Sequence, residues 1–173
     1  MKKWLLVVLG VLVTLVAVVA GIGALLPREH VATLSARFQQ PPEKIWQAIS
    51  DYPSFTSWRP GLKSVEALPE KNGWPQWKET WSDGTVMPLE MMEFVPPQRM
   101  VTRIADPALP FGGTWTYELK PDGAGCTLTI TENGYVNPAL FRFMSRFIFG
   151  HTSTIDDYLR ALAKKFGSDV SLM

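Results

Sequence analysis

The chain has 173 residues, a formal net charge of +1 and an apolar load that includes seven Trp, nine Phe and seven Met. This length allows one domain once the apolar N-terminal segment is set aside, and the scattered Lys and Arg residues argue against nucleic acid as a partner. The single cysteine, Cys126, excludes an internal disulfide. It is interpreted as a packed thiol, because the residues after it have the pattern of a strand.

An apolar run from Trp4 to Leu26 follows Lys2 and Lys3. As a helix it would be roughly 35 Å long, enough to cross a hydrocarbon core of about 30 Å. We therefore predict an anchor over residues 1–27 that tethers the chain to a membrane through residues 4–26. The positive-inside rule places the N-terminus in the cytoplasm and the domain on the extracytoplasmic side. The alternative is a cleaved signal peptide, which would make the protein secreted.

The next segments predict one strand and two short helices. Residues 30–38 alternate, with Ala32, Leu34, Ala36 and Phe38 on one face, as in a half-buried strand. Because this strand starts directly after Leu26, we expect the domain to lie against the bilayer. Pro41-Pro42-Glu43 opens a helix over residues 42–50, and residues 52–58 predict a second helical turn.

About six antiparallel strands are expected between residues 62 and 136, because β-rich runs there are separated by turn sequences. Those turns are Asn72-Gly73, Asp83-Gly84, Pro96-Pro97, Phe111-Gly112-Gly113 and Pro121-Asp122-Gly123. Trp115, Tyr117 and Leu119 alternate with polar residues, as do Cys126, Leu128 and Ile130 in the following run. These two runs therefore predict an antiparallel pair of strands with one apolar face.

Asn137-Pro138 then begins a long helix over residues 138–166, which is apolar at three- and four-residue spacing and has a possible bend at Gly150. A tail over residues 168–173 completes the chain. An antiparallel sheet with one apolar face needs a cover, and this helix is the only one available. The sequence thus predicts an α+β domain in which a sheet of about seven strands curls around a C-terminal helix and leaves an apolar hollow.

Five stretches also carry a family resemblance. They are residues 42–46, Asp51-Tyr52-Pro53 with Trp58, residues 94–100, residues 112–117, and Asn137-Pro138 through Gly150-His151 to Tyr158-Leu159. Together they resemble the helix-grip fold of the SRPBCC (START and Bet v 1-like) superfamily, and in particular its bacterial polyketide cyclase/dehydrase-type members. The resemblance implies a helix-grip domain over residues 28–167. Members hold lipids, sterols, polyketides or hormones in the hollow, and a minority catalyse cyclisation or dehydration there.

Candidate ligand-binding residues lie on the strands and on the long helix. We expect Trp77, Glu90, Arg103, Trp115, Tyr117, Phe143, Phe147 and His151 to contact the ligand, and Trp58, Arg59 and Phe111 to flank the pocket entrance. His151 lies on the apolar stripe of the long helix, where it is either a hydrogen-bonded core histidine or a ligand-contacting group. Neither His30 nor His151, the two histidines of the chain, belongs to a Cys/His/Asp cluster at metal-ligand spacing, so no metal or cofactor is expected.

The turn sequences also predict a cross-strand row. If Asp83-Gly84 and Pro96-Pro97 each form a two-residue turn, Trp77 faces Glu90 and Glu90 faces Arg103. The row is either an ordinary ion pair beside an aromatic residue or a buried Arg–Glu pair in the hollow. Both faces of these strands carry large apolar residues, so alternation leaves both interpretations open.

Two functional readings follow. The first is a membrane-tethered binding module for an apolar or lipid-like small molecule, favoured by the aromatic content and by the absence of nucleophile motifs and phosphate-binding loops. The second is a cyclase/dehydrase-like enzyme that uses His151 or the Glu90–Arg103 pair for proton transfer. A structural domain whose hollow is filled by its own aromatic side chains is a third possibility. The anchor argues for lipid-like ligands over a cytosolic biosynthetic substrate.

Overall fold

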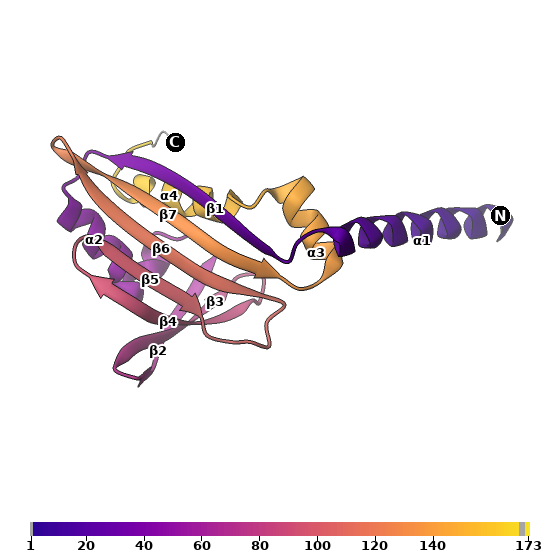
Figure 1. Cartoon of the computed structure of the whole chain (residues 1–173), viewed down its shortest axis with the longest axis horizontal. Coiled ribbons are helices and arrows are strands. Elements are labelled where there is room, and N and C mark those ends of the chain that lie inside the picture. Colours follow the sequence, from indigo (N-terminus) through magenta and orange to yellow (C-terminus); the bar gives the residue numbers. More distant parts are fainter. Residues whose placement is uncertain (1, 170–171) are drawn as a thin grey trace.

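The computed structural model describes residues 2–169, 172 and 173, which form an extended N-terminal helix and one sheet-and-helix domain (Figure 1). Helix α1 (Lys2–Leu25) projects away from the domain, and its side chains are almost all exposed. It is long and apolar enough to cross a membrane. Its length, composition and position fit either an anchor or a signal sequence.

The domain is built on one antiparallel sheet of seven strands in the order β1-β7-β6-β5-β4-β3-β2. The strands are β1 (Glu29–Phe38), β2 (Leu62–Lys71), β3 (Trp74–Trp81), β4 (Val86–Val95), β5 (Arg99–Ile104), β6 (Phe111–Asp122) and β7 (Gly125–Val136). Helix α2 (Pro42–Ser50) and the 3-10 helix η1 (Tyr52–Ser57) follow β1, and helix α4 (Ser153–Lys165) covers the inner face of the sheet. The α+β helix-grip fold is therefore confirmed.

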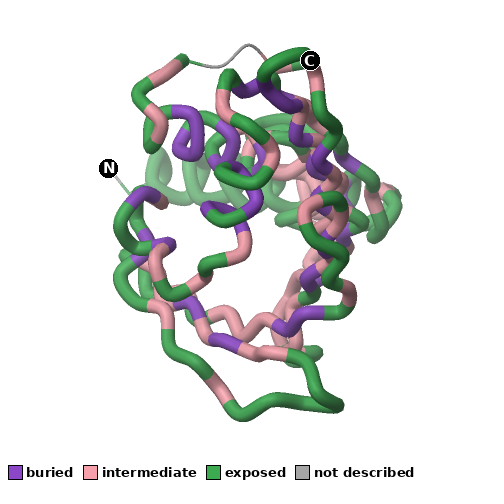
Figure 2. Tube along the Cα trace, turned by 90° about the vertical axis from the view of Figure 1, so that its left-hand side faces the viewer, coloured by how far each residue is buried: buried purple, intermediate pink, exposed green. Residues whose placement is uncertain are grey.

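Alternating side chains place the core between the sheet and α4. Strand β1 pairs with β7, and β7 with β6, so that Leu128 lies opposite both Ala36 and Leu119. On α4, Ile155, Leu159 and Leu162 recur at three- and four-residue spacing and are fully buried. Each such side chain contributes about 1.5–3 kcal/mol through burial. Figure 2 shows the buried positions gathered on the helices and at alternate points of the sheet.

The predicted long C-terminal helix is interrupted. Helix α3 (Ala139–Met144) continues into a π-helical turn (η2, Ser145–Phe149), and the chain then breaks at Gly150 before α4 begins. Gly150 has φ +78°, which lies outside the right-handed helical region and is readily adopted by glycine. Of the predicted long helix, the part that covers the inner face of the sheet is α4. Helix α3 instead packs against α1.

The contact between α1 and α3 depends on a glycine. Gly23 is the buried residue of α1, and a Cβ atom there would overlap the backbone carbonyl of Ala139. Because no side chain intervenes, the two helices approach closely at this point. The end of α1 is thus held against the start of α3, beside the first residues of β1 (Figure 1).

The chain's C-terminal end adds to the free edge of β1. Ser35 and Met173 exchange backbone hydrogen bonds of 3.1 and 2.9 Å, and Leu172 forms a β-bridge with Ala36. Residues 170 and 171 of the predicted tail lie outside the described residues. These contacts cover part of an edge that would otherwise present unpaired backbone groups.

The thiol of Cys126 lies in the core, as the sequence predicts, opposite Phe38. Burial, with a smaller effect from Glu43 and Asp122, raises its pKa to about 11. We therefore expect the folded protein to resist a thiol reagent such as Ellman's reagent at pH 7.5, and to react fully once denatured. A Cys126→Ala variant supplies the background, and rapid labelling of the native protein would contradict this prediction.

Candidate functional site

A cavity of about 370 Å³ lies between the inner face of the sheet and the η1–α4 side of the domain. This volume is within the range of roughly 300–1,000 Å³ typical of small-molecule sites. Strands β3 to β6 supply most of its wall. Its large apolar lining residues are Phe55, Trp77, Trp81, Met87, Leu89, Ile104, Phe111, Trp115 and Tyr117. The lining residues with polar side chains are Arg59, Glu79, Asp83, Thr85, Thr102, Glu132 and Thr154.

The most deeply buried charges in this wall are Arg59 and Glu79. Arg59 follows η1 and Glu79 lies on β3, and Arg59 Nη1 donates a hydrogen bond of 2.6 Å to Glu79 Oε1. Their side chains are only 13% and 2% exposed. Trp77 Nε1 donates a second hydrogen bond of 3.3 Å to the same oxygen. Two charges removed from water in this way carry a desolvation cost of several kcal/mol per ion, which their attraction offsets only with good geometry.

Three aromatic rings surround the Arg59 guanidinium. Its Cζ lies 5.2 Å from the ring centroid of Phe55, 4.9 Å from that of Trp81 and 5.3 Å from that of Tyr158. A guanidinium within about 6 Å of an aromatic face is attracted by the ring quadrupole. The cage thus fixes Arg59, and through it the carboxylate of Glu79, at the cavity wall.

Two polar atoms of the lining residues have no hydrogen-bond partner among the described residues. They are Glu79 Oε2 and Trp81 Nε1, both inaccessible to solvent. An unsatisfied buried acceptor or donor costs about 1–3 kcal/mol. The first atom needs a donor and the second an acceptor, and a hydroxyl group has both capacities. These two buried atoms lie in the wall of the cavity, and a ligand would reach them once the side chains that cover them move.

A second carboxyl group, that of Glu132 on β7, also lines the cavity. Burial raises its pKa, and the nearby His30, whose Nε2 is 3.4 Å from Glu132 Oε1, opposes that shift. His30 stacks on His151 with ring centroids 4.2 Å apart. Burial, followed by the charges of His30 and Arg146, lowers the pKa of His151. His151 lines a separate pocket beside the end of α1, so its predicted place in the hollow is wrong.

The structure brings only part of the predicted site together. Trp77, Trp115 and Tyr117 line the cavity, as do two of the predicted entrance residues, Arg59 and Phe111. These five residues converge from β3, β6 and the segment after η1. Burial raises the pKa of the Tyr117 phenol far above its usual value, so it remains a neutral hydroxyl.

Three other predicted residues do not line the cavity. Trp58 is a core residue that packs edge-on against Phe55 and Tyr158, at centroid distances of 5.5 and 5.2 Å. Phe143 and Phe147 contact each other in the α3–η2 segment, with ring centroids 4.9 Å apart and the rings tilted by 48°. They lie outside because Gly150 diverts that segment away from the sheet.

The predicted row of Trp77, Glu90 and Arg103 is also corrected. Between β3 and β4 the loop contains three residues, since Trp81 N donates to Thr85 O. The register therefore shifts by one, and Glu90 faces Gln76 instead of Trp77. Glu90 does face Arg103, as predicted.

Because neighbouring residues of a strand point to opposite faces, Glu90 and Arg103 lie on the outer face of the sheet while Trp77 lies in the cavity. Glu90 accepts hydrogen bonds from Arg103 and Gln76. Burial alone would raise the pKa of Glu90, but the hydrogen bonds and charge of Arg103 lower it below its usual value. Arg103 is 45% exposed, so the pair supports the outer face and forms no part of the cavity.

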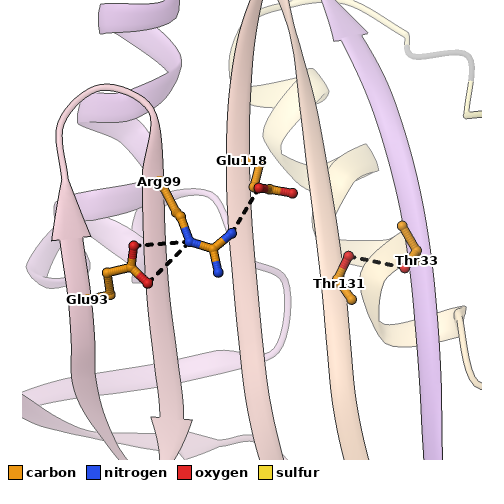
Figure 3. Close-up of polar contacts among 5 residues, drawn as sticks. All are labelled: Thr33, Glu93, Arg99, Glu118 and Thr131. Atoms are coloured by element: carbon orange, nitrogen blue, oxygen red, sulfur yellow. Dashed lines mark hydrogen bonds and ion pairs between the residues drawn. The ribbon is translucent and has the colours of Figure 1, made fainter.

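Other polar contacts tie the outer face together. Arg99 on β5 bridges Glu93 on β4 and Glu118 on β6, with hydrogen bonds of 2.8 to 3.2 Å (Figure 3). The hydroxyl groups of Thr33 and Thr131 are 3.1 Å apart across β1 and β7. Such exposed pairs contribute about 0–1 kcal/mol each. The charged network and the ligand-sized cavity are thus on opposite sides of the sheet.

Sequence reasoning missed Glu79 and Glu132 as site residues. A signal for Glu79 was present, because Trp77, Glu79 and Trp81 alternate along one strand and must share a face. A carboxylate between two tryptophans on a buried face needs a cation or a hydrogen-bond donor close to it. That partner, Arg59, is 20 residues away in the chain and was predicted only as an entrance residue.

Comparisons with known proteins agree with the fold. A protein from Chromobacterium violaceum superposes with a TM-score of 0.58 at 20% identity, covering 83% of this chain and 100% of that one. A protein from Thermobifida fusca gives 0.61 at 20%, covering 79% and 93%. The di-domain ARO/CYC StfQ from the steffimycin biosynthetic pathway gives 0.59 at 13%, covering 81% and 52%. At these identities the likeness shows a shared fold.

A search of curated proteins finds no match. The family model described as polyketide cyclase / dehydrase and lipid transport matches residues 29–167, which include all seven strands and α4. This chain therefore belongs to the polyketide cyclase / dehydrase and lipid transport family.

Proposed function

We propose that this protein is a membrane-tethered binding protein for an apolar small molecule that carries a hydroxyl or similar group at one end. The observation that carries the proposal is the aromatic-lined cavity with a single caged ion pair, in which Glu79 Oε2 has no hydrogen-bond partner among the described residues. An apolar ligand body would replace water along the tryptophan and phenylalanine walls. Its polar end would donate a hydrogen bond to Glu79 after a small movement of the side chains that cover this carboxylate.

The binding cavity can be tested with 2-naphthol as a probe, because its fused ring is small enough for the cavity and its hydroxyl can donate. We expect saturable binding by isothermal titration calorimetry to the full-length protein in lipid nanodiscs, with empty nanodiscs as the reference. Leu89→Phe fills the cavity from β4 and should weaken binding about tenfold or more, since an added ring competes for the same space. Met92→Phe, on the exposed side of the same strand, is the matched control. Equal affinity of both variants would contradict the proposal.

Tethering is the second part of the proposed function. The apolar span of α1, the two lysines at its start and its contact with α3 through Gly23 support a retained anchor with the domain on the extracytoplasmic side. We expect the protein to remain in the membrane pellet after alkaline carbonate extraction, with an intact mass that includes residues 1–20. A soluble product that begins near Gly21 would instead establish signal-peptide cleavage.

A second candidate function is cyclisation or dehydration in the same cavity. Glu132 favours it, because burial raises the pKa of a carboxyl that lines the cavity and so holds a proton closer to neutral pH. If the protein turns over a bound polyketide-like substrate, Glu132→Gln should reduce kcat about a hundredfold while leaving 2-naphthol binding unchanged. Unchanged turnover in this variant would remove Glu132 as the acid.

A further inference from the structure

A second pocket, of about 380 Å³, lies where α1 ends and β1 begins. Its lining includes Arg142 of α3, Arg146 of η2 and Arg28, which immediately precedes β1. His30 and His151 complete its polar lining together with the carboxylate of Glu29. With neutral histidines the lining carries three positive charges and one negative charge.

The single carboxylate of Glu29 offsets only part of this positive charge. Within the described part of the chain, none of Arg28, Arg142 and Arg146 forms an ion pair, and the buried Nε of Arg142 has no hydrogen-bond acceptor. The carboxylate of Glu132 lies 3.4 Å from His30. A concave site with three unpaired guanidinium groups is suited to an anion, and guanidinium forks bind phosphate oxygens in a bidentate manner.

The surroundings of this pocket indicate where the anion resides. Five large apolar side chains of α3 and η2 are 45–62% exposed, namely Leu140, Phe141, Phe147, Ile148 and Phe149. A segment with exposed aromatic residues interleaved with arginines is typical of helices that lie in the headgroup region of a bilayer. Gly23 holds this segment against the end of α1, so the pocket lies at the level where a spanning α1 leaves the hydrocarbon.

We propose that this pocket binds the phosphate of an anionic phospholipid from the bilayer that α1 spans, with the apolar side chains of α3 and η2 inserted beside its acyl chains. The inference rests on the proposed tethering. It adds a specific lipid contact that is separate from the ligand cavity, and it fixes the orientation of the domain on the membrane. Arg142 and Arg146 supply the central contacts, and Arg28 flanks them.

The test measures which lipid the full-length protein retains. Protein in detergent is mixed with equal amounts of phosphatidylglycerol and phosphatidylcholine with the same acyl chains, separated by gel filtration, and its bound lipid is quantified by mass spectrometry. We expect phosphatidylglycerol to be retained at least fivefold over phosphatidylcholine. The Arg142→Gln/Arg146→Gln double variant should retain the two lipids about equally, while Arg160→Gln, an exposed arginine of α4, should leave the ratio unchanged.

Each further outcome decides the proposal. Equal retention of the two lipids by the natural protein would overturn it. Displacement of phosphatidylglycerol by 10 mM inorganic phosphate would also overturn it, because the pocket would then be a site for a soluble anion. If the double variant fails to fold, as judged by its melting temperature, Arg28→Gln on the exposed side of the pocket takes its place and must lower the ratio. Failure of tethering would appear separately, in the carbonate extraction, because lipid retention is measured in micelles.

Discussion

Replacing Arg59 with methionine is expected to lower the free energy of unfolding by about 3–5 kcal/mol. The change leaves the carboxyl group of Glu79, which is 2% exposed, with only the indole N–H of Trp77 as a hydrogen-bond donor. It also empties the cage formed by Phe55, Trp81 and Tyr158. Chemical denaturation of the full-length protein in detergent, followed by circular dichroism, measures the loss.

Two matched variants separate the effect of breaking a buried ion pair from the effect of removing an arginine charge. Arg99→Met removes an arginine with two carboxylate partners at 40% exposure and should cost no more than about 1 kcal/mol. The double variant Arg59→Met/Glu79→Leu should recover most of the loss, because an apolar pair of similar volume replaces a buried ion pair at little cost. If Arg59→Met costs no more than Arg99→Met, the buried pair does not have the energetic role assigned to it.

The second large effect concerns ligand selection. We expect the protein to bind 2-naphthol at least tenfold more tightly than naphthalene, because a hydrogen bond to a charged acceptor is worth about 1.5–3 kcal/mol. Glu79→Gln should reduce this preference to a few-fold, since the neutral amide is a weaker acceptor and disturbs the contact with Arg59. Calorimetry with both probes in nanodiscs gives the ratio of their dissociation constants. Each probe partitions into the lipid to the same extent with every variant, so this effect cancels when the variants are compared.

Glu90→Gln is the matched control for this experiment, because Glu90 is an equally buried carboxylate on the other face of the sheet. It should leave the preference for 2-naphthol unchanged. A preference that falls equally in both carboxylate variants would mean that the effect is one of stability. A natural protein that binds both probes equally would remove Glu79 as the polar contact.

Much of the fold could be predicted because its signals are local. Alternation in β1, β6 and β7 identified the buried faces correctly, since each of these strands has one apolar and one polar side. The pairing of Glu90 with Arg103 was predicted for a partly wrong reason. The loop between β4 and β5 contains three residues instead of the expected two, which would shift the pairing by one position. A β-bulge at Met92 shifts it back, so Glu90 still faces Arg103.

The candidate site was harder to predict because its signals are long-range. The Asp83-Gly84 turn is longer by one residue than its sequence suggests, and a slip of one residue exchanges the faces of a strand. Both faces of β3 and β4 carry large apolar side chains, so composition could not correct the error. Gly150 was identified as a bend, but the departure of α3 toward α1 depends on the close approach at Gly23.

The most direct test of the binding function is native mass spectrometry of the full-length protein released gently from membranes. We predict an adduct of one apolar small molecule with a hydroxyl or similar polar group, which is lost in Leu89→Phe and kept in Met92→Phe. It should also be weakened in Glu79→Gln. A natural protein that carries no adduct and acquires none when incubated with 2-naphthol would contradict the assignment of the cavity as a binding site.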